Sequence, residues 1–255
     1  MRSVGKRGPT DAITQSQHLA AKVIAETGAD ALKAPVVWLQ HMASGVTIDL
    51  SDPDPAHITL TDICRGLSRI RRWSGQAGKT EAGDFDFSVG QHVLSSHDSV
   101  PEVVASSPDA PQTKSFVRRV RRHLVVHDMP ETYTGDIITP LKILLGRQLR
   151  AIEDLFDERI AKAIGMPVET DPVVLAWAKE IDVAASWAEM TLCFPSTAHR
   201  SRVRYTDRQV AIANVMLPHI ARRSRQSQRS VAAQLHKLAI RHGARESLER
   251  KEAAA

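Results

Sequence analysis

The dipeptide His127-Asp128 ends an apolar stretch of the sequence and is followed closely by two more carboxylates, Glu131 and Asp136. Ionisable groups that emerge from an apolar face are costly unless they pair with one another or bind a metal ion. Glu131 follows at a spacing that places it on the same helical face, and Asp136 follows a glycine that can turn the chain back. These four residues are therefore the first candidates for chemistry.

Two other segments carry the same residue types at inward-facing positions. His92 lies in the middle of the short apolar run FSVGQHV, and a helical stripe of mostly small residues contains the second carboxylate: Leu175, Ala178, Asp182, Ala185 and Glu189. Together with His127-Asp128, His92 and Asp182 supply two imidazoles and two carboxylates, which suit one divalent ion such as Mn, Co, Fe or Zn. An ion-paired helical core is the alternative, because buried charges are also tolerated when they are paired.

Two other histidine patterns favour no chemistry. His97-Asp98 repeats the dipeptide, but it lies in a Ser-rich stretch interrupted by prolines, so we expect a surface loop or a helix end there. His123 stands one helical turn before His127, a spacing that suits zinc, yet no HExxH motif is present and arginines precede it. We interpret His123 as a neighbour of the site and not as a ligand.

The elements that must position the candidate residues are mostly helices. SFVRRVRRHLVVHD predicts a helix with its apolar residues and His127 on one face and its arginines off that face. Residues 146–166 and 171–190 predict two long helices, the first closed by Gly165 and the second opened by Asp171 and Pro172. Strand signals are sparse, so the fold class is all-α.

The remaining segments give shorter predictions. Thr61 and Asp62 predict the N-cap of a helix that runs to Trp73, and FSVGQHVLSS predicts a short helix that ends in a loop near His97. Residues 74–84 read as a polar loop, residues 36–60 as one or two short strands or an extended segment, and residues 12–32 as a helix.

Length and composition limit the class of protein. A chain of 255 residues that is 42% hydrophobic can bury a proper core. No apolar run approaches the roughly 18 residues that a membrane-spanning helix needs, and the basic N-terminus has no apolar segment behind it, so we expect a cytoplasmic protein without membrane contact. Cys64 and Cys193 stand in unrelated contexts and predict reduced thiols.

The positive charge of the chain is concentrated at its end. Residues 200–255 hold 13 Lys or Arg against 4 Asp or Glu, although the whole chain carries only +5. Such a segment can bind the phosphates of nucleic acid, which gives a rival function of a different class. We favour instead a pair of helices that pack on the core, because the segment has amphipathic stretches after Thr206, has Tyr205 as its only aromatic residue and matches no nucleic-acid motif.

Five segments, in order, resemble the HD-domain phosphohydrolases, in the branch of 5'-deoxynucleotidase-like and nucleotide-hydrolysing proteins. They are ITLTDICRGLSRIRRW, FSVGQHVLSS, VVHDMPETYTGDIITPLK, LRAIEDLFDERIAKAIGM and EIDVAASWAEM. The likeness covers about residues 38–192. It implies an HD-type helical bundle at residues 36–195, between an N-terminal extension at 1–35 and a basic helical extension at 196–255.

The resemblance also implies roles for single residues. It makes His92, His127, Asp128 and Asp182 the ligands of one divalent ion, and it gives Glu131 and Asp136 proton transfer and water positioning. It places Arg72 on the substrate phosphate, which a planar guanidinium suits, with Lys142 adding positive charge and Trp73 packing on the sugar or base. For Arg72, Lys142 and Trp73, solvation or plain packing is the alternative.

The activity implied by the resemblance is hydrolysis of a nucleotide, most simply a deoxynucleoside 5'-monophosphate. The alternative within the same family is release of triphosphate from a deoxynucleoside triphosphate, which needs the same metal core and differs in the surrounding walls. The resemblance further implies a homodimer, for which the sequence gives no independent sign.

Overall fold

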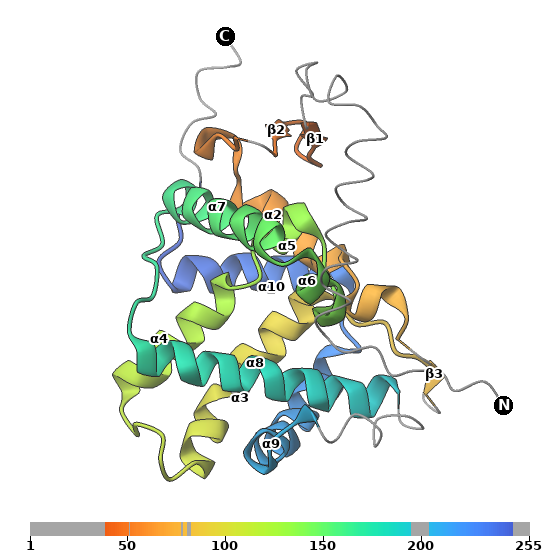
Figure 1. Cartoon of the computed structure of the whole chain (residues 1–255), viewed down its shortest axis with the longest axis vertical. Helices are drawn as coiled ribbons and strands as arrows, with labels where there is room; N and C mark the ends of the chain where they lie inside the picture. The colour runs from red at the N-terminus through yellow and green to blue at the C-terminus, as the bar shows by residue number, and fades with distance from the viewer. Residues whose placement is uncertain (1–38, 51, 78, 81–82, 195–203, 247–255) are drawn as a thin grey trace, which may run out of the picture.

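The computed structural model describes residues 39–50, 52–77, 79–80, 83–194 and 204–246, and this part of the chain is mostly helical (Figure 1). The predicted all-α class is confirmed. The longer helices are α2 (Leu60–Arg69), α3 (Val89–Ser106), α4 (Lys114–Val126), α7 (Arg147–Ile164), α8 (Pro172–Cys193), α9 (Asp207–Arg223) and α10 (Gln228–Arg241). The predicted helix at residues 12–32 lies outside the described residues.

The remaining elements are short. Two helices, α5 (Glu131–Thr134) and α6 (Thr139–Leu145), follow the His127-Asp128 pair, and two 3-10 turns, η1 (Pro55–His57) and η2 (Arg72–Gly75), flank α2. Strands β1 (Leu39–His41) and β2 (Thr47–Asp49) pair antiparallel, with Gln40 opposite Ile48, which confirms the short strands expected there. Strands β3 (Lys79–Thr80) and β4 (Gly83–Asp84) form a small hairpin where we predicted only a polar loop.

Two hydrophobic clusters make up the described core, and α3 belongs to both. The first cluster joins the C-terminal half of α3 to α4, α8 and α9, and the second joins its N-terminal half to α2, α7 and α10. Because α3 passes from one cluster to the other, a side chain near its middle lies deep in the molecule. Figure 1 shows α8 crossing the bundle with α9 beside it.

The basic C-terminal segment contributes to the core. α9 buries Ile212, Met216 and Ile220 in the first cluster, and α10 buries Val231 and Leu235 in the second. The interpretation of this segment as helices packed on the core is therefore confirmed, and at about 25 cal/mol per Å² such burial stabilises the whole fold. The domain boundaries at 35 and 195 stay predictions.

The helix that precedes Arg72 starts and ends earlier than predicted. Thr59, not Thr61 or Asp62, is the N-cap of α2, because its hydroxyl accepts a hydrogen bond from the Asp62 amide. The helix ends at Arg69, and the Arg72 amide then donates to the Phe87 carbonyl at 2.9 Å. This backbone pairing with a segment far along the chain ends the helix before Arg72. The spacing of apolar residues near Arg72 does not predict it.

Helix α3 is longer than predicted. FSVGQHVLSS indeed forms a helix, with Ser88 and Gln91 as a capping box, but the helix continues through His97 and Pro101 to Ser106. A proline inside a helix costs one backbone hydrogen bond. Here Val100, Val103 and Val104 are completely or almost completely buried, so apolar packing outweighs that cost. The predicted loop at His97-Asp98 was wrong.

The other helix predictions are confirmed. α4 buries Phe116, Val120 and Leu124 as one face, and Thr113 caps its start. Gly165 closes α7 in the left-handed conformation with φ of 67°, and Asp171 caps α8 with Pro172 in its first turn. Among the described residues, no helix is both long enough and apolar enough to cross a membrane.

Candidate metal centre

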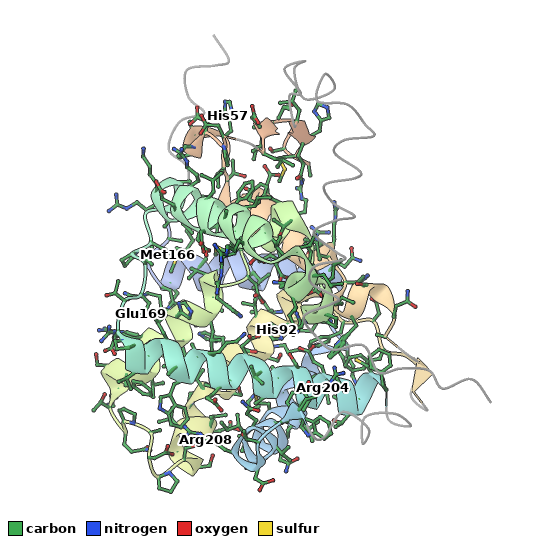
Figure 2. The ribbon with its side chains drawn as sticks, viewed as in Figure 1. His57, His92, Met166, Glu169, Arg204 and Arg208 are labelled. Atoms are coloured by element: carbon green, nitrogen blue, oxygen red, sulfur yellow. The ribbon has the colours of Figure 1, made fainter. Side chains whose placement is uncertain are left out.

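His92, His127 and Asp128 come together at the centre of the molecule, where Figure 2 labels His92. Each offers one ligand atom, and these atoms all lie within 4.8 Å of one another. The Nε2 atom of His127 is 3.2 Å from Asp128 Oδ1, and the Nε2 atom of His92 is 3.6 Å from Asp128 Oδ2. Two imidazoles and a carboxylate at this separation could hold a metal ion.

Asp182, the fourth predicted ligand, lies beside both imidazoles. Its Oδ1 atom is 3.3 Å from His92 Nε2 and 3.8 Å from His127 Nε2. Its other oxygen accepts from the exposed Lys179 ammonium at 2.7 Å. Asp182 therefore places one oxygen beside the two imidazoles and the other against the exposed Lys179. The four predicted ligands, which come from α3, the end of α4 and α8, lie together.

The two imidazoles are oriented with Nε2 inward because Nδ1 is already engaged. The Nδ1 atom of His127 lies 3.1 Å from the Leu124 carbonyl, to which it donates. The Nδ1 atom of His92 lies 2.6 Å from Glu189 Oε1. When one ring nitrogen donates its hydrogen to a carboxylate or carbonyl, the tautomer is fixed. The lone pair of the other nitrogen is then left to bind a metal ion.

Several buried polar atoms at this centre have no hydrogen-bond partner in the protein. They include His92 Nε2, His127 Nε2 and Asp128 Oδ2, with Glu131 Oε2 nearby. Buried polar atoms are nearly always satisfied, so a group of unpaired ligand atoms that face one another calls for a bound species. The residues present thus fit a cation.

Charge leads to the same conclusion. Five carboxylates gather here, Asp128, Glu131, Asp136, Asp182 and Glu189, against three permanent cations among the described residues, Arg72, Lys142 and Lys179. Burial lowers the pKa of His92, but the Glu189 and Asp182 carboxylates outweigh it and raise that pKa to about 10. The pKa of His127 is raised as well, against burial, by Asp128 and Asp182. Without a metal ion, protons take its place on the imidazoles.

Arg72 lies beside the centre and is held by two carboxylates. Its Nη1 donates to Asp136 Oδ1 at 3.1 Å, and its Nε donates to Glu189 Oε2 at 3.2 Å. The side chain of Arg72 is 13% exposed, so these ion pairs lie mostly away from solvent. Asp136 thus holds the predicted phosphate-binding residue in place, and its own oxygens are occupied by Arg72 and the Trp73 amide.

Trp73 adopts an unusual backbone conformation in η2. Its φ is 58° and that of Ser74 is 51°, values that cost free energy for residues other than glycine. The Trp73 amide donates to Asp136 at 3.0 Å, the indole Nε1 donates to Glu189 at 3.1 Å, and the ring packs edge-on against Phe194. Backbone strain of this kind is tolerated where surrounding contacts fix a side chain at a site.

Glu131 is 5% exposed and lies at the start of α5. Burial, together with the negative charges of Asp128 and Asp136, raises the pKa of Glu131 well above its usual value. Lys142 of α6 lies 3.5 Å from Glu131 and 3.0 Å from Glu153, and its role toward the substrate phosphate stays a prediction. A carboxyl with a raised pKa can act as a general acid.

Glu189 is the residue that sequence reasoning missed. It is fully buried and binds His92, Arg72 and the Trp73 indole at once. The signal was available, because Glu189 stands two helical turns after Asp182 on the same stripe of α8. His123 packs its ring 6.1 Å from that of His127 without offering a ligand atom to the group, as interpreted from the sequence.

Comparison with known proteins assigns no family. No family model matches the chain. An uncharacterized protein of Rhodobacter capsulatus is 34% identical over 128 residues, which cover 50% of this chain and 59% of that protein. The chain therefore spans about three-fifths of the length of this relative, whose name describes no activity.

Proposed function

We propose that this protein is a metal-dependent phosphohydrolase of the HD-domain type that acts on nucleotides, most simply on a deoxynucleoside 5'-monophosphate. The observation that carries the proposal is the pair of inward-facing, unpartnered Nε2 atoms of His92 and His127 beside Asp128. Arg72, which shares Glu189 with His92, supports a substrate that brings phosphate oxygens.

His92, His127, Asp128 and Asp182 would hold one divalent ion, with Mn, Co, Fe and Zn as the candidates. A divalent ion held there supplies Lewis acidity toward a phosphoryl oxygen and lowers the pKa of water. The nitrogen and oxygen ligands do not select one metal by affinity alone, so geometry and availability decide the identity.

The residues around the ligands take separate roles. Arg72 binds and orients the phosphate, and its position is fixed by Asp136 and Glu189. Glu131, whose pKa burial and neighbouring carboxylates raise, would serve as the general acid toward the oxygen of the departing nucleoside. Lys142 adds positive charge at the edge of the metal centre and so favours an anionic substrate. Trp73 lies next to Arg72 and fixes that side of the site.

A nucleotide panel tests this function. Deoxynucleoside mono- and triphosphates are incubated with the protein after loading with Mn, Co, Fe or Zn, and again with EDTA. We expect phosphate from the monophosphates and its loss on chelation. Triphosphate released from the triphosphates would instead establish the alternative activity, and equal rates with and without EDTA would refute metal-dependent hydrolysis.

A further inference from the structure

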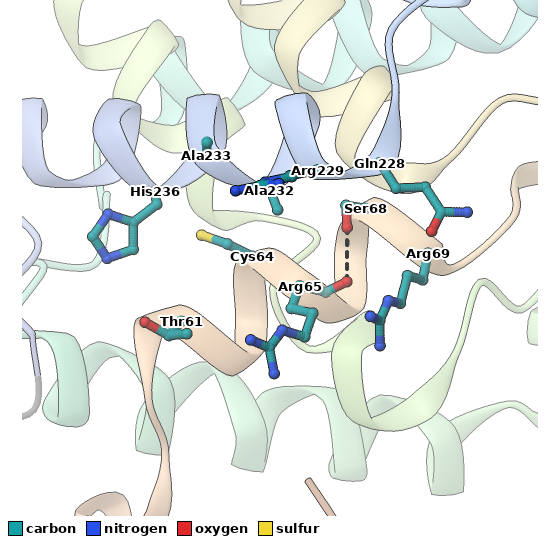
Figure 3. Close-up of a pocket in the computed structure, with 10 residues that line it drawn as sticks. All are labelled: Thr61, Cys64, Arg65, Ser68, Arg69, Gln228, Arg229, Ala232, Ala233 and His236. Carbon is teal, nitrogen blue, oxygen red and sulfur yellow. Dashed lines mark hydrogen bonds between the residues drawn. The ribbon is translucent and has the colours of Figure 1, made fainter. Parts of the chain in front are cut away.

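A groove between α2 and α10 lies apart from the metal centre and has no role in the proposed hydrolysis. It encloses about 660 Å³, within the range of small-molecule sites, and shares no lining residue with the candidate metal centre. Figure 3 shows the two helices side by side, with Cys64 and Ala232 between them and polar side chains along the edges.

Three arginines line this groove without a carboxylate partner among the described residues. Arg65 and Arg69 stand one turn apart on α2, and Arg229 lies in the first turn of α10. In Figure 3, Arg229 lies along the α10 wall, while the guanidinium groups of Arg65 and Arg69 extend from α2. Like charges four residues apart on a helix repel, so this arrangement is unfavourable until an anion joins it.

The nearby carboxylates are already engaged. Asp62 accepts from Ser44 and Thr59, and Glu246 pairs with His236 at the end of the groove. Among the described residues, neither carboxylate forms an ion pair with Arg65, Arg69 or Arg229. The guanidinium charge of this groove is left for a ligand, and a planar guanidinium prefers phosphate or carboxylate oxygens.

The groove favours a compact anion with more than one phosphate group. Its arginines come from both walls, Arg65 and Arg69 from α2 and Arg229 from α10, and a chain of phosphates that extends along the groove can contact both walls. None of its lining residues is Phe, Tyr or Trp, and stacking of bases on such rings is a main source of affinity for single-stranded nucleic acid. A small polyphosphate-bearing ligand fits these walls better than an oligonucleotide does.

We propose that the groove between α2 and α10 binds a small ligand that carries two or more phosphate groups. The α10 wall of this groove also packs on α3, the helix that carries His92. A Cβ atom added at Gly90 of α3 would lie 2.7 Å from Val231 and 2.8 Å from Leu235, so α10 packs directly on α3 two residues before His92.

Binding of inorganic tripolyphosphate tests the proposal. The full chain is titrated by calorimetry at constant ionic strength with EDTA present, so that no metal ion recruits the probe. We expect the double variant Arg65→Gln and Arg229→Gln to bind at least tenfold more weakly than wild type, because two charge-assisted contacts are lost. Arg118→Gln, an exposed arginine of α4, is the matched control and should stay within twofold.

A second variant does not depend on the arginines. Ala233→Glu adds a carboxylate at an exposed position of α10 beside the groove, and we expect it to weaken tripolyphosphate binding about fivefold or more. Equal affinity in wild type and the double variant, or no binding by wild type, overturns the proposal. So does a single-stranded oligonucleotide that binds this surface more tightly than tripolyphosphate.

Discussion

The chain contains two His-Asp dipeptides, and their surroundings differ in the sign of the charge. His127-Asp128 lies among further carboxylates, with ligand atoms that lack a partner. His97-Asp98 lies among arginines, and its polar atoms are bonded. The same dipeptide therefore forms a candidate metal site in one place and a structural network in the other, and the residues brought to it by the fold decide which.

The network at His97 is complete without an ion. The geometry fits a neutral ring whose Nδ1 donates to Asp98 at 3.2 Å and whose Nε2 accepts from Arg121 at 3.0 Å. His242 at the end of α10 lies 3.1 Å from the same Nε2. Asp98 in turn accepts from Arg223, so this network connects α3 to α4, α9 and the end of α10.

The largest expected difference between the two pairs is in hydrolysis. Asp128→Asn removes a charged ligand and should lower metal-dependent nucleotide hydrolysis by about a thousandfold, beyond the roughly 10- to 100-fold that loss of an outer partner costs. Asp98→Asn, the same change in the other pair, should leave the rate within about threefold. Initial rates with saturating metal ion measure both. Similar losses in the two variants would contradict the distinction between the pairs.

The network around His97-Asp98 should matter for stability and not for hydrolysis. Arg223→Ala leaves the buried network without its main cation and should lower the free energy of unfolding by about 3 kcal/mol. Arg222→Ala is the control, because Arg222 bonds the same carboxylate but its side chain is 61% exposed, so the cost should stay below about 1 kcal/mol. Urea unfolding measures both losses. Equal losses would show that the exposed Arg222 stabilises Asp98 as much as the buried Arg223 does.

Glu189→Gln should weaken the metal centre without unfolding the protein. The variant loses the charge that orients His92 and Arg72, and we expect a 10- to 100-fold loss of metal affinity in competition with a chelator. Glu180→Gln on the same helix should have no effect. Unchanged affinity in Glu189→Gln would mean that His92 is oriented without its carboxylate partner.

The smallest effect concerns pH. Burial, together with the neighbouring His97 and Arg121, lowers the pKa of His242 to about 4, whereas the unfolded chain takes up that proton near pH 6.5. The folded state binds fewer protons in this range, so the free energy of unfolding falls as the pH falls from 6.5 towards 4. His242→Gln should reduce the loss between pH 7 and pH 5 by roughly 1 kcal/mol, allowing for solvent screening.

Urea unfolding of wild type and His242→Gln at the two pH values checks this. Parallel losses in the two proteins would show that other groups carry the acid sensitivity. His123 is one such group, because burial and His127 lower its pKa to about 4.

Most of the fold and the meeting of the four candidate ligands could be predicted because their signals are local. Phe116, Val120 and Leu124 recur at helical spacing, and polar ligands on otherwise apolar stripes mark side chains that face inward. The convergence of His92 and Asp182 on His127-Asp128 follows once three helices each bury that face.

The rest depends on contacts between residues far apart in the chain. Ser and Pro near His97 predict a loop, but burial of Val103 and the distant Arg223 keep the segment helical and covered. The left-handed backbone of Trp73 depends on Asp136 and Glu189, which local propensity does not include. The role of a buried charged residue can therefore be assigned only when the fold shows which partners lie beside it.

Metal content tests the central claim most directly. Wild type, His127→Ala and His97→Gln are loaded with Mn, Co, Fe or Zn, desalted and analysed for bound metal per chain. The account predicts close to one ion per chain in wild type and His97→Gln and less than a tenth of that in His127→Ala. Full metal content in His127→Ala, or none in wild type with any of the four ions, would contradict it.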